Sequence, residues 1–140
     1  MSARRSPAAV RGRTLVLDEG LSLWGGMDPA SGELIDSHHP QRGASLAGRV
    51  VIMPSGRGSS SSASVLAEAA RAGTAPAAFV LGEPDLILSV GAAVAEELYG
   101  TRIPVIVRSA ARLARIPDGV EMIVGPRGGL RRVPTRVMSA

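Results

Sequence analysis

The sequence predicts one domain of mixed α/β class. Its 140 residues, 45% of them hydrophobic, suffice for one sizeable core but are too few for two full domains. Short apolar segments between glycine-rich turns fill the first half, whereas apolar segments alternate with helix-favouring segments in the second. Aromatic residues make up only 2% of the chain, so aliphatic side chains must build the core, as in thin α/β layers.

Short strands and turns are expected at the start of the chain. Residues 1–12 are rich in Arg, Ala and Ser without periodicity, which predicts a flexible arm, and order is expected from about Thr14. Residues 14–17 predict a first strand, 21–24 form a second apolar patch, and 33–36 predict another short strand. Together these segments predict a compact β layer.

A buried strand followed by a helix is expected in the middle of the chain. Residues 49–53 form a continuous apolar run, which predicts a strand buried on both faces. Alanine and leucine over 65–73 favour a helix that ends at Gly73. The serine-rich segment between them is therefore expected to lead into a helix.

Strands and helices alternate through the second half. In order, we expect a strand over 77–81, a helix over 85–99 with its stop at Gly100, a strand over 105–107, a short helix over 110–113 and a strand over 120–124. Glu96 and Glu97 are expected on a solvated helix face. The folded domain is predicted over 13–128, with residues 129–140 as a flexible, arginine-rich tail.

Charge and hydropathy disfavour nucleic-acid and membrane partners. The net charge is +4, but all 16 basic residues are arginines dispersed along the chain, and few aromatic side chains are present to stack on bases. No apolar stretch approaches the roughly 20 residues needed to span a bilayer. The first residues lack the apolar run of a signal peptide, so we expect a cytoplasmic location.

Metal-ligating residues are scarce. The sequence contains no cysteine, and its two histidines are the neighbours His38 and His39, whose side chains diverge on extended backbone. The chain is therefore not expected to bind a metal or an iron–sulfur cluster by itself. Any metal that the chemistry needs is expected from a partner.

Residues 56–62, which we call the serine loop, combine features of an anion-binding site. Gly56 and Gly58 allow close approach of the backbone to a ligand, Arg57 offers a two-pronged donor, and a helix N-terminus presents free N–H groups. A flexible linker or a helix cap would also explain serines here, but neither requires the arginine. The lack of any lysine excludes a Walker A loop, and three serines after Gly58 break the dinucleotide fingerprint. We favour anion binding.

Three motifs in a fixed order carry a resemblance to a known family. The segments LSLWGGMDP (21–29), HP (39–40) and MPSGRGSSSS (53–62) closely resemble the small subunit, or swivel domain, of aconitase X. The resemblance extends over about residues 14–107. It implies a swivelling β/β/α domain that closes over a large subunit, which carries the iron or iron–sulfur centre and most substrate contacts.

The same resemblance implies roles for the serine loop. Ser59 matches the family's proton acceptor, and Arg57, Gly58, Ser60 and Ser61 are expected to bind the substrate. A neutral serine is a very weak base, so this role requires an alkoxide-like oxygen, which the helix N-terminus and Arg57 would stabilise.

Three functions follow as hypotheses. The first is the small subunit of a hydro-lyase that is inactive without its large subunit and converts cis-3-hydroxy-L-proline to Δ1-pyrroline-2-carboxylate. The resemblance implies this substrate, because bacterial members of the family look like cis-3-hydroxy-L-proline dehydratases. The second keeps this architecture but dehydrates 5-phosphomevalonate, as archaeal relatives do, because the same loop accepts phosphate. The third is a free-standing anion-binding module without a catalytic partner.

Three further residues have alternative interpretations. Trp24 is expected either to line the site or a subunit interface or to anchor the core. His39 is expected in an exposed loop, although a polar contact in the site is an alternative. Asp28, before a proline, is expected to form a turn rather than act as an acid.

Overall fold

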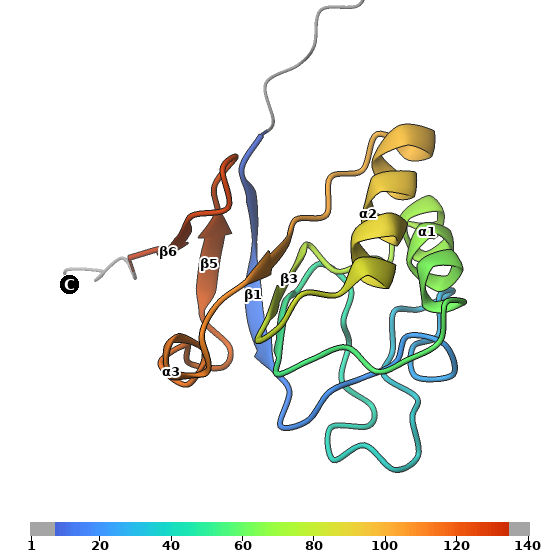
Figure 1. Cartoon of the computed structure of the whole chain (residues 1–140), viewed down its shortest axis with the longest axis horizontal. Helices are drawn as coiled ribbons and strands as arrows, with labels where there is room; N and C mark the ends of the chain where they lie inside the picture. Colours follow the sequence, from blue (N-terminus) through green and yellow to red (C-terminus); the bar gives the residue numbers. More distant parts are fainter. Residues whose placement is uncertain (1–7, 135–140) are drawn as a thin grey trace, which may run out of the picture.

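The computed structural model describes residues 8–134 (Figure 1). Helices and strands follow one another as β1 (Val10–Val16), β2 (Val50–Met53), α1 (Ser62–Ala72), β3 (Ala78–Leu81), α2 (Leu86–Tyr99), β4 (Val105–Val107), α3 (Ala110–Leu113), β5 (Glu121–Val124) and β6 (Leu130–Arg132). This is the mixed α/β class that the sequence predicts.

One six-stranded sheet, in the order β4-β3-β2-β1-β5-β6, organises the domain. Strands β1 to β4 are parallel, with Leu15 opposite Val51 and Val51 opposite Phe79. Strand β5 runs antiparallel to β1, and β6 antiparallel to β5. The loops that follow the four parallel strands therefore share one side of the sheet, the carboxyl edge, where ligands bind in many open α/β sheets.

Different elements cover the two faces of the sheet. Helices α1 and α2 and the long β1–β2 connection pack on one face, where Leu66, Phe79 and Leu81 belong to the larger hydrophobic core (Figure 1). On the other face, α3 and the β5–β6 hairpin enclose a smaller core around Ile52, Val80 and Met122. Strand β2 thus has both faces covered, and all its residues are buried, as its continuous apolar sequence predicts.

Eight of the expected elements are confirmed, with ends that differ by a few residues: β1, β2, β3, β4, β5, α1, α2 and α3. Gly73 and Gly100 end α1 and α2 in the left-handed conformation, with φ of +78° and +66°. Glu96 and Glu97 are exposed on α2 as expected. Local signals suffice for α1 and α2 because each has its own apolar residues and ends at a glycine.

The predicted β layer in residues 21–36 is wrong. This part of the chain forms turns and isolated bridges, such as Met27 with Leu34, rather than regular strands. Leu21, Leu23 and Leu34 are nevertheless buried in the larger core. Their apolar pattern reflects a loop that packs beneath α1 and α2, so alternation here reports burial and not strand pairing.

The predicted limits of the folded domain need correction at both ends. Strand β1 begins at Val10, inside the expected arm over 1–12, because residues 10–13 pair with β5. Strand β6 lies inside the expected tail over 129–140 and pairs with β5 through Leu130 opposite Val124. Residues 1–7 and 135–140 lie outside the described residues, so flexibility there stays a prediction.

The longest helix of the described residues, α2, has 14 residues, and no helix in this part of the chain is long and apolar enough to cross a membrane.

Candidate functional site

The serine loop leaves the carboxyl edge after β2 and enters α1. Gly56 forms a parallel bridge with Leu21, and the Arg57 N–H donates to the Leu21 carbonyl oxygen at 3.1 Å. The loop is therefore fixed along the β1–β2 connection and is not a flexible linker. The order strand, loop, helix is the one that the sequence predicts.

The side chain of Ser59 accepts a backbone hydrogen bond just before α1. Its Oγ accepts the Ser61 N–H at 3.1 Å, and its carbonyl oxygen accepts the Ser62 N–H at 3.0 Å. Ser61 occupies the cap position but makes no side-chain cap bond. The half-buried Ser59 oxygen thus receives a backbone donor at the positive end of an 11-residue helix, and both features stabilise negative charge on it.

Backbone donors beside Ser59 remain available to a ligand. Among the residues that the structure describes, the N–H groups of Gly58, Ser59 and Ser60 donate to no protein acceptor. Successive free N–H groups at a helix start form an anion-binding position. This is the arrangement expected for holding a carboxylate or phosphate group.

Arg57 lies beside these donors with its side chain 61% exposed. Its Nη1 is 3.8 Å from the Glu19 Oε1, which is a long and solvent-exposed ion pair of little strength. The guanidinium group therefore has donors left for a ligand. No local sequence signal marks Glu19 as a partner of residue 57.

Both glycines of the loop have close neighbours, and Gly58 also has a backbone conformation that favours glycine. Gly58 has a φ of +123°, and a Cβ atom there would approach the Ser22 Oγ to 2.8 Å. A Cβ atom on Gly56 would collide with the carboxylate of Asp85. Asp85 in turn caps α2 by accepting the Leu88 N–H at 2.9 Å, so the loop rests on the start of both helices.

Ser62 differs from the other loop serines because it is buried. Its Oγ accepts the Trp24 N–H at 3.2 Å and lies 3.3 Å from the Ser22 Oγ. Ser62 therefore connects α1 to residues 22–24, and its role is structural. Ser60, by contrast, is exposed at the turn before α1.

The pocket at the serine loop of this chain is very small. The pocket beneath the loop, lined in part by Leu21, Gly58, Ser59 and Asp85, measures about 10 Å³, which is room for roughly one water molecule. Trp24 borders the loop through its bond to Ser62 and is 60% exposed, so the core-anchor interpretation of Trp24 is wrong. A substrate bound here would need a second surface to enclose it.

His39 corrects another expectation, because it is buried and not exposed. Its Nδ1 accepts the Gln41 N–H at 3.0 Å, and its Nε2 bonds to the Glu19 carbonyl oxygen at 3.2 Å. The ring thereby orders the backbone of the residue that faces Arg57. Asp28 forms the expected turn, accepting the Ala30 N–H at 2.9 Å.

Metal ligation does not fit the described residues. The sequence holds no cysteine, and no group of three or more His, Asp and Glu side chains in the described part of the chain lies close enough together to hold one ion.

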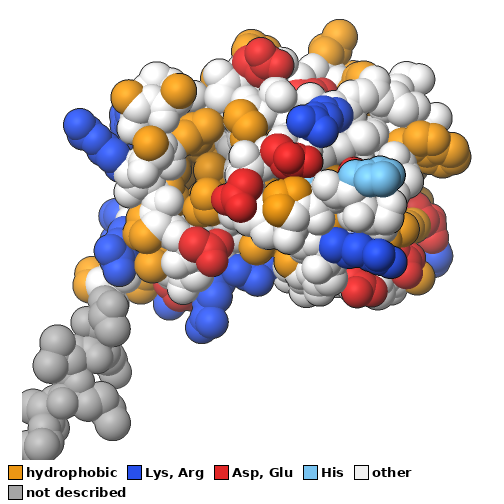
Figure 2. Space-filling view, turned by 90° about the horizontal axis from the view of Figure 1, so that it is seen from below, with side chains coloured by type: hydrophobic (Ala, Val, Ile, Leu, Met, Phe, Trp, Pro, Cys, Tyr) orange, Lys and Arg blue, Asp and Glu red, His pale blue; other side chains and the backbone are white. Residues whose placement is uncertain are grey.

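Charges of both signs are interspersed on the face that Figure 2 shows from below, on the side where the parallel strands end. Away from this side, on α1, hydrogen bonds from Arg71 lower the pKa of Glu68, and the same bonds raise the pKa of Arg71. That pair lies outside the serine loop, where the charged side chains are Arg57, its partner Glu19 and Asp85.

Comparison with known proteins adds the family. The aconitase X swivel domain matches residues 2–131. This chain belongs to the aconitase X swivel-domain family. A chain in the crystal structure of Thermococcus kodakaraensis aconitase X (holo-form) has the same fold: it superposes with a TM-score of 0.77 at 24% identity, covering 92% of this chain and 93% of that one.

Two curated relatives of this swivel domain are dehydratases. A cis-3-hydroxy-L-proline dehydratase of Pseudomonas aeruginosa is 53% identical over 94 residues, which are 67% of this chain and 16% of that protein. A phosphomevalonate dehydratase small subunit of Methanopyrus kandleri is 46% identical over 82 residues, 59% of this chain and 61% of that protein. This chain thus spans less than two thirds of each relative.

Proposed function

We propose that this swivel domain is the small subunit of a heteromeric hydro-lyase that converts cis-3-hydroxy-L-proline to Δ1-pyrroline-2-carboxylate. The observation that carries the proposal is the serine loop, which places a hydroxyl that accepts a backbone N–H, free N–H groups and an arginine in the lining of one small pocket just before a helix. The P. aeruginosa relative supports the choice of substrate.

In this proposal, Ser59 accepts the proton from the carbon that bears the substrate carboxylate. The C–H electron pair forms the C=C bond as hydroxide leaves the neighbouring carbon, and the resulting enamine tautomerises to the Δ1 imine. Negative charge on the Ser59 Oγ is stabilised by the Ser61 N–H and by the helix dipole.

The other loop groups bind and orient the substrate. The N–H groups of Gly58, Ser59 and Ser60 and the guanidinium of Arg57 hold the carboxylate, while the Ser60 and Ser61 hydroxyls add polar contacts. Holding this carboxylate fixes the acidic C–H bond beside Ser59, which is the main gain that positioning brings to an elimination.

The proposed partner is an aconitase X-type large subunit, in which we place the iron or iron–sulfur centre. The small pocket, which cannot enclose a substrate, supports a second subunit. Exposed apolar side chains near the loop support it as well: Trp24 is 60% and Leu86 79% exposed. We accordingly expect this chain alone to have no dehydratase activity.

The second candidate is phosphomevalonate dehydration. A guanidinium group and free N–H groups at a helix start bind phosphate as well as carboxylate, and the M. kandleri relative favours this substrate. A competition assay with both hydroxy acids on the assembled enzyme distinguishes the candidates. Turnover of 5-phosphomevalonate but not of cis-3-hydroxy-L-proline would reassign the substrate and retain the loop chemistry.

Ser59→Ala in the assembled enzyme tests the catalytic assignment. We expect kcat to fall by about 10²-fold or more, the usual effect of losing a general base. The matched control is Ser64→Ala, an exposed serine two residues inside α1, which should retain wild-type kcat. Most turnover remaining in Ser59→Ala, with the fold intact by circular dichroism, would sink the assignment. A chain that binds small anions but no large subunit would instead favour a free-standing module.

A further inference from the structure

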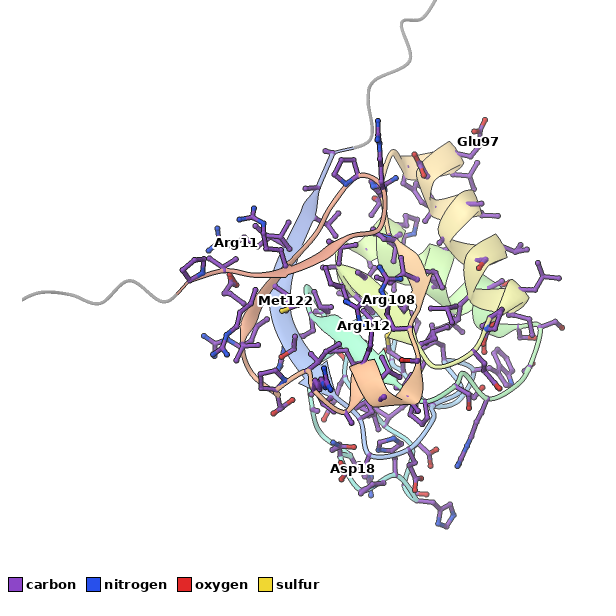
Figure 3. The ribbon with its side chains drawn as sticks, turned by 60° about the vertical axis from the view of Figure 1, so that its left-hand side comes forward. Arg11, Asp18, Glu97, Arg108, Arg112 and Met122 are labelled. Carbon is purple, nitrogen blue, oxygen red and sulfur yellow. The ribbon has the colours of Figure 1, made fainter. Side chains whose placement is uncertain are left out.

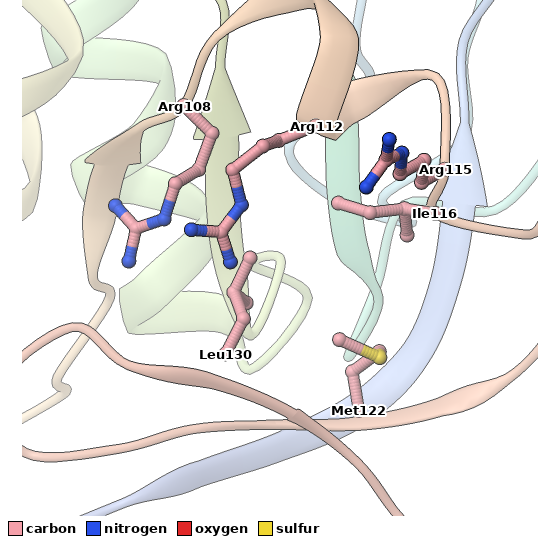
Figure 4. A pocket seen from close by; sticks show the side chains of 6 residues that line it. All are labelled: Arg108, Arg112, Arg115, Ile116, Met122 and Leu130. Carbon is pink, nitrogen blue, oxygen red and sulfur yellow. The ribbon is translucent and has the colours of Figure 1, made fainter.

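A second basic site lies on the opposite face of the sheet from α1 and α2. Helix α3 has only four residues and leaves a pocket of about 460 Å³ between itself and the β5–β6 hairpin. We call it the arginine pocket; its lining residues are Arg108, Arg112, Arg115, Ile116, Met122 and Leu130 (Figure 4). Its volume lies within the usual range of small-molecule sites.

Backbone carbonyls hold Arg108 in place. Its Nη1 donates to the Val107 carbonyl oxygen at 2.8 Å, and its Nη2 donates to that of Gly128 at 2.6 Å, in the turn before β6. An arginine has five N–H donors, so this anchoring leaves donors free while it fixes the plane of the group. Part of the ordering cost of a binding arginine is thus already met in the fold.

Arg112 extends beside Arg108, and both side chains point toward Leu130 (Figure 4). Figure 3 shows the same two arginines reaching from separate segments into the region near Met122. Within the described residues, the side chains of Arg112 and Arg115 donate to no protein acceptor. The ion pairs of the described residues are formed by other arginines, outside the pocket lining: Arg11–Glu121, Arg57–Glu19 and Arg71–Glu68.

Adjacent guanidinium groups without a carboxylate between them repel each other, and an anion relieves that repulsion. The rest of the pocket is apolar: Met122 is buried, and Ile116 and Leu130 are partly buried against the smaller core. A ligand that satisfies both parts has an anionic head and a short apolar body.

We propose that the arginine pocket binds a carboxylate or phosphate group attached to an apolar body. This site lies across the sheet from the serine loop and does not depend on the function proposed for that loop. Its ligand has one of two sources, a free organic anion or an acidic side chain of the large subunit. Both present the same chemistry to the three arginines.

Titration of the full chain with butyl phosphate and inorganic phosphate, followed by NMR of its backbone amides, tests the proposal. We expect butyl phosphate to bind at least about tenfold more tightly, because its carbons cover the apolar floor. Shifts should centre on residues 108, 112, 115–116 and 128–130. Arg112→Gln and, as a second variant, Arg115→Gln should each weaken binding by about tenfold, the effect of losing a charge-assisted hydrogen bond.

The matched control is Arg131→Gln, an exposed arginine on β6 that does not line the pocket, and it should bind butyl phosphate like the wild type. Affinity for the large subunit, measured for the same variants, distinguishes the two sources. If the variants bind the large subunit like the wild type, and the wild-type chain binds butyl phosphate tightly, the ligand of the pocket is a free anion. Assembly weakened by Arg112→Gln but not by Arg131→Gln, and inhibited by butyl phosphate, assigns an acidic side chain of the partner.

Two outcomes overturn the proposal. One is binding of butyl phosphate no tighter than that of inorganic phosphate and insensitive to Arg112→Gln, which leaves only general attraction to a basic surface. The other is that the wild-type chain binds neither butyl phosphate nor inorganic phosphate, while the Arg112→Gln variant binds the large subunit as tightly as the wild type.

Discussion

Three buried polar side chains connect segments that are distant in sequence. Thr14 donates from its Oγ to the Pro117 carbonyl oxygen at 2.6 Å and accepts the Val120 N–H at 3.0 Å. His39 and Ser62 likewise each bond to other parts of the chain. A buried polar group costs stability unless it is hydrogen-bonded, and all three are satisfied here.

We predict that His39→Ala lowers the free energy of unfolding by about 2 kcal/mol, because it removes two hydrogen bonds and leaves the Gln41 N–H without its acceptor. Urea denaturation measures this change. The neighbouring exposed His38 is the control, and His38→Ala should stay within about 0.5 kcal/mol of the wild type. Equal effects of the two substitutions would contradict the buried role of His39.

Gly58→Ala tests the geometry of the serine loop. A φ of +123° and the nearby Ser22 Oγ predict a loss of about 1–3 kcal/mol in stability, together with reduced kcat of the assembled enzyme. Gly43→Ala provides the control, since Gly43 has a φ of +95° but no neighbour within 4 Å of its Cβ position. It should lose stability through backbone strain alone and keep its kcat. Wild-type kcat in Gly58→Ala would contradict the placement of the loop in the active site.

At the scale of elements, α2 is apolar on two sides. Leu88, Gly91, Ala92 and Ala95 are buried, with Gly91 close to Ala63 at the start of α1. On its outer surface, a row at four-residue spacing stays exposed: Leu86, Val90, Val94 and Leu98. A helix that is apolar beyond its core face usually packs against a further surface. The row begins one residue after Asp85, which contacts the serine loop, so a partner on that loop is well placed to cover it.

We predict that the double substitution Val90→Glu and Leu98→Glu raises the Kd for the large subunit by at least about tenfold, since two carboxylates would be placed in an apolar interface. Surface-immobilised binding assays measure this Kd. Ala93→Glu, exposed on the polar row with Ser89 and Glu97, is the control and should bind normally. Tight binding by the double variant, or a wild-type chain that dimerises alone through this row, would contradict the assignment.

At the scale of the whole molecule, the last strands of the chain complete one edge of the sheet. Strand β5 returns to pair with the start of β1, and β6 adds the last strand beyond β5, so β5 alone separates the strands that hold the two ends of the described chain (Figure 1). Leu130 packs against the smaller core, and the Val133 N–H donates to the Glu121 carbonyl oxygen at 3.0 Å. Residues 130–133 are therefore part of the fold.

Truncation tests the contribution of β6 to stability. A chain that ends at Gly129 should lose about 2 kcal/mol of unfolding free energy, because it forfeits the β5–β6 ladder and the burial of Leu130. A chain that ends at Pro134 retains β6 and should unfold like the full chain. Thermal or urea unfolding compares the two. If both truncations were equally stable, β6 would not contribute to the fold.

Residues 49–113 illustrate what the sequence alone determines. Continuous apolar runs define β2, β3 and β4, and Gly73 and Gly100 end the helices, because these signals act within a few residues of one another. The same local logic places the serine loop before α1, and with it the backbone donors around Ser59. The catalytic role of Ser59 and the substrate stay predictions.

Tertiary structure decided the features that depend on distant partners. Residues 10–13 and 130–132 carry no strong local pattern and become strands only because both pair with β5. Leu21, Leu23 and Leu34 look like strand residues but are buried in a packed loop, and His39 is buried by contacts with residues 19 and 41. In the site, the Arg57–Glu19 pair and the contact of Gly56 with Asp85 join residues roughly 30 to 40 positions apart, and such contacts exist only once the β1–β2 connection has folded beside α1 and α2.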